Sequence, residues 1–230
     1  MYTQNYKEGD TLKNVALANT LIRISKNGRK EFYEGETANI MVDFLDSKNG
    51  IITLEDFKAY EAIWRDPVVF NYKDLKIISM SPPSSGGVCL AQILKLIEPY
   101  PIKDYGHNSL KTIQVITEAE RRAYADRSFY LGDPDFVSIP SKKLISTDYL
   151  KGRMELFSFE KATDSKSLSY GSIPGFESLE TTHYSIVDPY GNAIAVTTTL
   201  NGAYGSKLYV DQLGFFLNNE MDDFSAKPGE

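Results

Sequence analysis

The first sixty residues carry apolar side chains at helical spacing. One apolar face covers residues 12–24 and a second lies within residues 37–50, and an Asn-Gly pair closes each stretch. Asparagine and glycine are typical of positions where helices end, so two helices are predicted. Thr53 and Asp56 have the spacing of an N-cap pair, which predicts a third, short helix that runs to Tyr60.

Short β-rich runs then replace the helical period. Residues 67–72 and 75–80 have the pattern of a hairpin or of neighbouring strands. The cluster "SPPSSGG" predicts a turn, and the apolar run after it, residues 88–98, predicts a buried helix. A longer helix is predicted for about residues 110–130, and "GDPD" is expected to end regular structure there.

A change in composition precedes the last part of the chain. Residues 161–178 are rich in Ser, Gly, Asp and Lys, which is typical of an exposed and mobile connection. Two β-rich runs follow, "THYSIVD" and "AIAVTTTL", and the turn-forming "PYGN" joins them, so an antiparallel hairpin is predicted. The mixture of helices and strands indicates an α+β fold in which helices are layered on sheets.

The hairpin predicts one particular cross-strand pair. If its turn centres on Tyr190, Val187 faces Ala193, and antiparallel counting then places Thr181 opposite Thr199. Directly opposed residues have Cβ atoms ~4.5–5.5 Å apart, close enough for one hydroxyl to hydrogen-bond the other. A register shift of one residue would move the whole strand to the other face. Threonine pairs also occur in ordinary strands, so the pair alone leaves a purely structural role open.

The composition narrows the classes of partner. The 230 residues are 42% hydrophobic, enough for a sizeable core, and the formal net charge of -6 argues against a nucleic-acid-binding surface. No apolar run approaches the ~20 residues that span a bilayer, and residues 1–10 lack the apolar core of a signal peptide. His107 and His183 lie far apart without a ligand cluster, so no metal is expected, and Cys89 fits a core position in an apolar helix.

Several longer motifs resemble one family. The segments "TTHYSIVD", "GNAIAVTTTLN", "YGS", "FFLNNEMDDFS", "PPSSGG" and "AYADRSFYLGDPDF" are similar to those of γ-glutamyltranspeptidase, or glutathione hydrolase, an N-terminal-nucleophile hydrolase made as a self-cleaving precursor. The resemblance implies a layered αββα fold, incomplete in this chain, and an enzyme without a cofactor. It also implies a location in the periplasm or outside the cell.

The resemblance implies a cleavage point between Glu180 and Thr181. Residues 1–180 would be the C-terminal part of a large subunit, with 161–180 as a mobile linker, and 181–230 the N-terminal part of a small subunit in a heterodimer from one precursor. Thr181 would become the nucleophile. Its liberated α-amine, with a pKa of ~7.7–8.0, suits a general base at neutral pH. A polar segment before a strand is also compatible with an ordinary surface loop.

The resemblance also assigns a substrate site. Thr199 corresponds to the second threonine, whose hydroxyl hydrogen-bonds the nucleophile, in agreement with the counted register. Asn201, Glu220 and Asp223 match positions that hold the α-amino and α-carboxylate ends of the γ-glutamyl group. From the residues alone, Asn201 fits a turn after a strand, and the two acids fit a solvated acidic run.

The implied reaction is hydrolysis or transfer of the γ-glutamyl group of glutathione and related amides, with water, an amino acid or a peptide as acceptor. Alternatives are a related amidase, acting on poly-γ-glutamate or on a β-lactam side chain, and a catalytically silent module. The family's substrate-binding arginine, expected upstream, and its serine and glycine pairs, expected downstream, have no counterparts here. These 230 residues alone are therefore not expected to be a competent enzyme.

Overall fold

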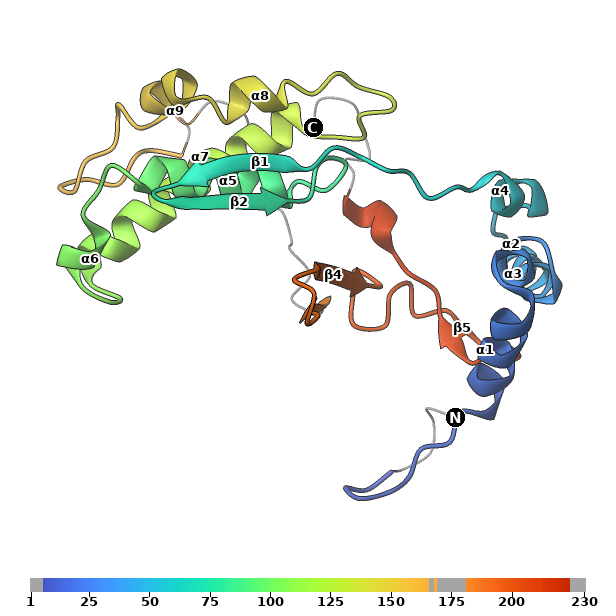
Figure 1. The fold of residues 1–230 in the computed structure, drawn as a ribbon. Helices are drawn as coiled ribbons and strands as arrows, with labels where there is room; N and C mark the ends of the chain where they lie inside the picture. Colours follow the sequence, from blue (N-terminus) through green and yellow to red (C-terminus); the bar gives the residue numbers. More distant parts are fainter. Residues whose placement is uncertain (1–5, 166–167, 169–180, 224–230) are drawn as a thin grey trace. The chain divides into compact units, whose positions relative to one another are not determined.

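The computed structural model describes residues 6–165, 168 and 181–223. The chain divides into two compact units: unit 1 contains residues 1–63 and 177–222, and unit 2 contains 64–176 and 223–230. Within the described residues, no helix has the length and apolar character needed to cross a membrane. Figure 1 shows the helices and strands along the chain.

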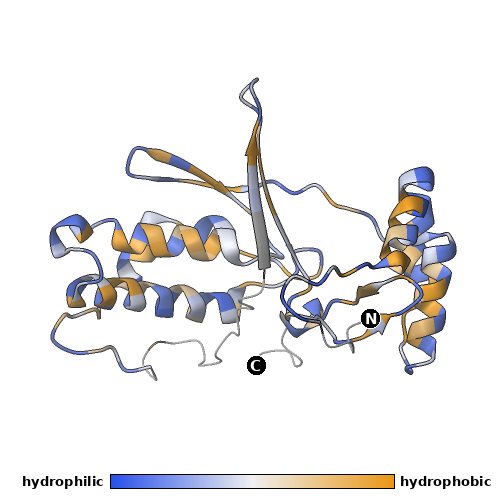
Figure 2. Ribbon diagram, turned by 90° about the horizontal axis from the view of Figure 1, so that it is seen from below, coloured by the Kyte–Doolittle hydropathy of each residue, from blue (hydrophilic) through white to orange (hydrophobic). Residues whose placement is uncertain are grey.

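Four helices form the N-terminal part of unit 1. Three were predicted from the sequence and are confirmed, while the five-residue helix between the first two was not predicted. Both polar and apolar residues lie along these helices (Figure 2). They are α1 (Val15–Asn27), α2 (Arg29–Tyr33), α3 (Glu36–Asp46) and α4 (Leu54–Ala59).

Side-chain caps fix where two of these helices begin. The Asn14 side chain accepts a hydrogen bond from the Leu17 backbone N–H, so α1 begins at Val15, three residues later than its apolar face. Thr53 accepts from the Asp56 backbone N–H, and the Asp56 carboxylate accepts from the Thr53 backbone N–H. This reciprocal capping box confirms the predicted start of α4.

Unit 1 is closed by contacts between its N-terminal helices and a segment two hundred residues later. The Asn14 Nδ2 donates to the Gly214 carbonyl at 2.6 Å, and the Thr20 hydroxyl donates to the Leu213 carbonyl at 3.0 Å. Thr20 is 1% exposed, whereas the apolar Leu21 and Ile22 are more than half exposed. The helix face that faces this segment is therefore partly polar, which the apolar pattern did not predict. Two short strands belong to the segment, β5 (Tyr209–Val210) and β6 (Phe215–Phe216).

A buried carboxylate joins three of the helices. Glu31 on α2 accepts hydrogen bonds from Arg23 on α1, at 2.8 Å, and from the Thr37 hydroxyl on α3, at 2.9 Å. Glu31 is only 6% exposed. The Arg23 hydrogen bond holds the pKa of Glu31 below its usual value, against the effect of burial.

The Glu31→Gln substitution should make unit 1 less stable at neutral pH. A carboxylate whose pKa is lowered in the folded state stabilises above its unfolded pKa, ~4.3, and loses that contribution as the pH falls through the folded value. The wild type and the variant should therefore differ fully at pH 7, and the difference should shrink as the pH falls through the lowered folded pKa of Glu31. Thermal unfolding between pH 3 and pH 8 measures this difference.

Glu36→Gln is a matched control, because Glu36 also pairs with Arg23. Its carboxylate lies 3.7 Å from Arg23 Nη1 and its side chain is 62% exposed, so its loss should change stability little. Equal effects of the two substitutions at pH 7 would contradict the role given to Glu31.

Unit 2 contains the predicted strands and both predicted central helices. The strands β1 (Val68–Tyr72) and β2 (Leu75–Ser79) form an antiparallel hairpin, and α5 (Gly86–Ile97) and α7 (Leu110–Tyr130) pack together. Figure 1 shows the hairpin alongside α5. One core cluster joins the two elements through Val68, Phe70, Val88 and Ala91. Cys89 is buried on α5, as predicted.

The prediction that regular structure ends at "GDPD" was wrong. Two short helices follow, α8 (Ser141–Leu144) and α9 (Thr147–Arg153), and α6 (Ile102–Tyr105) was also missed. The helices α8 and α9 each bury one residue, Leu144 or Leu150 respectively. A single buried leucine does not create an apolar period, so the pattern carried no signal for them.

One face of α7 buries charge in place of apolar side chains. Glu118, Arg122 and Asp126 follow one another at i, i+4 spacing, and each is less than 7% exposed. Arg122 pairs with Glu118, and Arg153 lies 3.0 Å from Asp126. Burial raises the pKa of Asp126 despite the attraction of Arg153. Of these residues, Asp126 lies in the motif "AYADRSFYLGDPDF", and it contributes there to the internal packing of unit 2.

Candidate active site

The predicted hairpin is confirmed, with the predicted register. Strands β3 (Thr181–Val187) and β4 (Ala193–Thr199) are antiparallel, Val187 pairs with Ala193, and Thr181 pairs with Thr199. The side chain of Thr181 lies outside the described part of the structure, as does all of Glu180. The backbone thus places the two threonines directly opposite each other at the start of one strand and the end of the next.

The turn between these strands explains why the register is fixed. Asp188 Oδ1 accepts hydrogen bonds from the backbone N–H groups of Tyr190 and Asn192, both at 2.9 Å, and Asp188 Oδ2 accepts from Asn192 Nδ2 at 2.7 Å. These bonds lower the pKa of Asp188, and the bond from the Asn192 side chain has the largest effect. Gly191 has a φ of 84°, which glycine adopts without strain. A turn closed in this way aligns the two strands that flank it.

The end of β4 leads into a sharp change of backbone direction. Asn201 has a φ of 70°, in the left-handed region that asparagine tolerates better than most residues. Its backbone N–H donates to the hydroxyl oxygen of Thr199 at 2.9 Å. Thr199 is half-buried, and this bond orients its hydroxyl oxygen. Thr199 and Asn201 are therefore held as one local unit.

The predicted acidic residues lie on a single turn of 3-10 helix. The turn η1 (Glu220–Asp223) follows β6, and the side-chain oxygen of Asn218 accepts from the Glu220 backbone N–H at 3.1 Å. Glu220 is half-buried, unlike the solvated acidic run that the residues alone allowed. The side chain of Asp223 lies outside the described residues.

Asn219 connects this turn to the end of β4. Its backbone N–H donates to the Leu200 carbonyl at 3.1 Å, and its carbonyl accepts from Asn201 Nδ2 at 3.1 Å. Its side chain accepts from the Gly202 N–H at 2.9 Å and donates to Asp222 Oδ2 at 2.6 Å. The fold thus brings the segment of Thr199 and Asn201 against the segment of Glu220.

Asn218 and Asn219 were not singled out from the sequence. Both stand in the motif "FFLNNEMDDFS", directly before Glu220, where asparagine is a common turn and capping residue. The available signal for a role of these asparagines was their position in the same motif as Glu220 and Asp223, two candidate binding residues. Nothing in the spacing indicates that Asn219 bonds a segment eighteen residues earlier.

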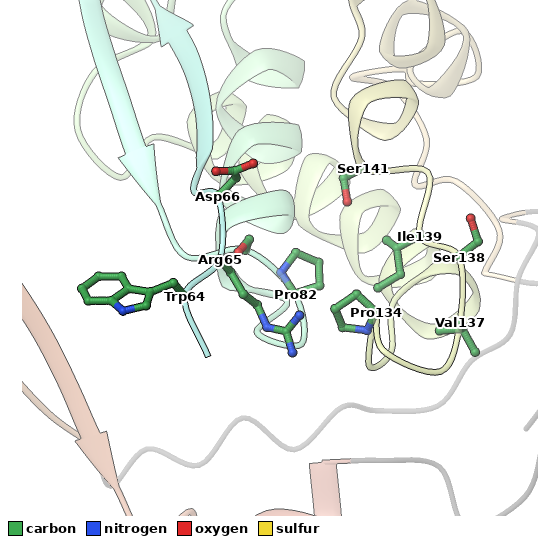
Figure 3. Close-up of a pocket in the computed structure, with 10 residues that line it drawn as sticks. Trp64, Arg65, Asp66, Pro82, Pro134, Val137, Ser138, Ile139 and Ser141 are labelled. Atoms are coloured by element: carbon green, nitrogen blue, oxygen red, sulfur yellow. The ribbon is translucent and has the colours of Figure 1, made fainter. Parts of the chain in front are cut away.

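A separate pocket of about 470 Å³ lies in unit 2 and contains none of the predicted site residues. Figure 3 shows its lining, with Trp64 directed away from the group formed by Pro82, Pro134 and Ile139. The Arg65 guanidinium forms two hydrogen bonds to Asp135, at 2.7 and 3.0 Å, which lower the pKa of that carboxyl group. Its charge is thus already paired. Across the described residues, no group of three or more His, Cys, Asp or Glu side chains is placed to hold a metal.

Comparisons with known proteins identify the family of this chain. A sequence model of the family described as gamma-glutamyltranspeptidase matches residues 2–230. The "Glutathione hydrolase proenzyme" of Escherichia coli is 45% identical over 97% of this chain, and the "Acylase ACY 1 proenzyme" of a Pseudomonas species is 34% identical over 92%. The crystal structure of Helicobacter pylori gamma-glutamyltranspeptidase is 44% identical, with a TM-score of 0.68 over 70% of this chain and 46% of that one.

The chain spans only 38% and 37% of the lengths of the two curated relatives. The solved neighbour supports the predicted α+β fold of the N-terminal-nucleophile hydrolases. The match of the family model over nearly the whole sequence is the strongest of these findings, because it includes the paired strands, the turn after β4 and the acidic turn. This chain belongs to the gamma-glutamyltranspeptidase family.

Proposed function

We propose that the whole protein hydrolyses or transfers the γ-glutamyl group of glutathione and related γ-glutamyl amides. The observation that carries this proposal is the pairing of Thr181 with Thr199 in a member of this family. The curated name of the Escherichia coli relative supports the choice of glutathione as substrate. The same residues would serve in maturation and in turnover.

The reacting groups in maturation would be the Thr181 hydroxyl, the Glu180 carbonyl and water. The Thr181 hydroxyl attacks the carbonyl carbon of Glu180, the amide C–N bond breaks, and the acyl group passes from nitrogen to oxygen. Water then hydrolyses the ester, which leaves a carboxylate on Glu180 and a free α-amine on Thr181. The two products are the large and small subunits, with residues 1–180 ending the first and residue 181 beginning the second.

Turnover repeats this chemistry on the substrate. The α-amine of Thr181 takes the hydroxyl proton, and the oxygen attacks the γ-carbonyl of the donor. The proton passes to the leaving amine, and a γ-glutamyl ester remains on Thr181. Water releases glutamate from this ester, or the amine of an amino acid or peptide takes the acyl group. Thr199 would hydrogen-bond the Thr181 hydroxyl and keep it aligned.

The donor would be held by its α-amino and α-carboxylate groups. Glu220 and Asp223 supply two carboxylates for the ammonium, and Asn201 supplies an amide for hydrogen bonding. Hydrogen bonds between opposite charges are stronger than neutral hydrogen bonds, and a partly dry site with a low dielectric strengthens them further. We place the protein in the periplasm or outside the cell, as the family resemblance implies. Its partners there would be the γ-glutamyl substrate and, for each subunit, the other subunit of the heterodimer.

Mass spectrometry and N-terminal sequencing of the purified whole protein test this function. We expect two polypeptides, the smaller one beginning Thr-Thr-His-Tyr, together with release of glutamate from glutathione. A single uncut polypeptide that releases no glutamate would contradict the proposal and favour a silent module.

A related acylase is the second candidate, because the Pseudomonas acylase is 34% identical to this chain. Competition between glutathione and a β-lactam with an acyl side chain separates the two candidates. Under the proposal, glutathione should be the preferred substrate. Preferred deacylation of the β-lactam would instead assign the acylase activity.

A further inference from the structure

Asn219 bonds two segments of unit 1 at once, residues 200–202 after β4 and the acidic turn η1. Its backbone holds Leu200 and Asn201, and its side-chain oxygen holds the N–H of Gly202 at 2.9 Å. Its side-chain nitrogen donates to Asp222 at 2.6 Å, inside the acidic turn η1. Asn219 is half-buried, whereas its neighbour Asn218 is exposed.

These bonds set the spacing between Asn201 and the turn η1, which contain the candidate substrate ligands. On one side lies Asn201, whose backbone is in the left-handed region and whose side-chain nitrogen donates to the Asn219 carbonyl. On the other side lies η1, which begins at Glu220, the residue directly after Asn219. A shift of one group against the other would misalign the two ends of a bound γ-glutamyl group.

We propose that Asn219 is a positioning residue for the γ-glutamyl donor. It acts through Asn201 and through the Glu220–Asp223 turn, and it does not itself touch the substrate. This inference rests on the proposed function, since it requires that those residues bind the donor. It predicts a role in donor binding and no role in self-cleavage, whose reacting groups are the Thr181 hydroxyl, the Glu180 carbonyl and water.

The Asn219→Asp substitution in the whole protein is the sharpest test. An aspartate of the same shape can still accept from the Gly202 N–H, but it sets a second carboxylate against Asp222 where a hydrogen bond was. We expect the KM for glutathione to rise about tenfold, while kcat stays within about twofold and self-cleavage is complete.

Helix α3 offers a control in the same unit. Asn39 is exposed and its Nδ2 donates to the Gly35 carbonyl at 2.8 Å, so Asn39→Asp also sets a carboxylate against an oxygen acceptor where a hydrogen bond was, outside the candidate site. This control should leave KM unchanged. The double variant Asn219→Asp with Asp222→Asn exchanges donor and acceptor, restores the hydrogen bond, and should return KM to within about twofold of the wild type.

The outcomes separate this inference from the proposed function. An unchanged KM in Asn219→Asp, or an equal rise in Asn39→Asp, would overturn the positioning role even when glutathione is still hydrolysed. If Asn219→Asp fails to fold, the double variant and Asn219→Ala, which adds no charge, decide the question by the same KM measurement. A wild-type protein that neither cleaves itself nor hydrolyses glutathione would refute the proposed function instead.

Discussion

Thr181→Ala is expected to abolish both self-cleavage and γ-glutamyl turnover in the whole protein. Alanine lacks the hydroxyl that would attack the Glu180 carbonyl, so the precursor stays as one polypeptide. Without cleavage no α-amine is liberated at residue 181, and the variant therefore lacks both nucleophile and base. Glutathione hydrolysis should fall by about 10⁴-fold or more, the scale seen when a catalytic nucleophile is removed.

Two neighbouring substitutions show whether this loss is specific. Thr181→Ser keeps a hydroxyl and should still cleave itself and turn over glutathione, at a reduced rate. Thr182→Ala leaves Thr181 intact and changes the residue paired with Thr198, so cleavage should proceed. Mass spectrometry reports cleavage, and a glutamate assay reports turnover. A processed and active Thr181→Ala protein would refute the assignment of the nucleophile.

The register of the β3–β4 hairpin could be predicted because its determinants are local. Asp188, Asn192 and Gly191 close the turn through bonds that span at most four residues. Once the turn is placed, the two-residue period of a strand determines every partner, out to Thr181 and Thr199. The capping box at Thr53 was predictable for the same reason.

Features that depend on distant parts of the chain were not predictable. The burial of Thr20 follows from its bond to Leu213, and the position of Asn219 follows from its bonds to Leu200 and Asn201. Hydrophobic periodicity predicts that a polar residue such as Thr20 is exposed to solvent, unless its hydrogen-bond partner is known. The sequence therefore predicted the candidate ligands Asn201 and Glu220, but not the residue that joins their segments.

The charged face of α7 shows the same limit in unit 2. Its length, Leu110–Tyr130, was predicted, but Glu118, Arg122 and Asp126 would be placed on a solvated face by their charge alone. In the structure they are buried, because Glu118 and Asp126 meet Arg122 and Arg153. Burial of charge is tolerated only where such partners exist, and the partner Arg153 lies on the unpredicted helix α9.

The adjacent glycines of "PPSSGG" should respond in opposite ways to alanine. A Cβ at Gly87 would lie 1.9 Å from the carbonyl oxygen of Met80 and 3.2 Å from the Cβ of Val68. Gly87 is buried in the first turn of α5, and the obstructing atom belongs to the backbone just after β2, so a side-chain rotation cannot relieve the clash. We expect Gly87→Ala to lower the stability by about 3 kcal/mol or more.

Gly86→Ala is the matched control, one residue earlier in the same helical turn. Gly86 is exposed, and its Cβ would meet only the Ser84 hydroxyl at 3.5 Å, an ordinary contact. Because alanine restricts the unfolded chain more than glycine does, Gly86→Ala should be neutral or stabilising by about 0.5 kcal/mol. Thermal unfolding of both variants measures the contrast. Equal midpoints would show that α5 does not approach Met80 so closely, whereas a lower midpoint for Gly87→Ala alone would identify Gly87 as the glycine that lets α5 pack against the end of β2.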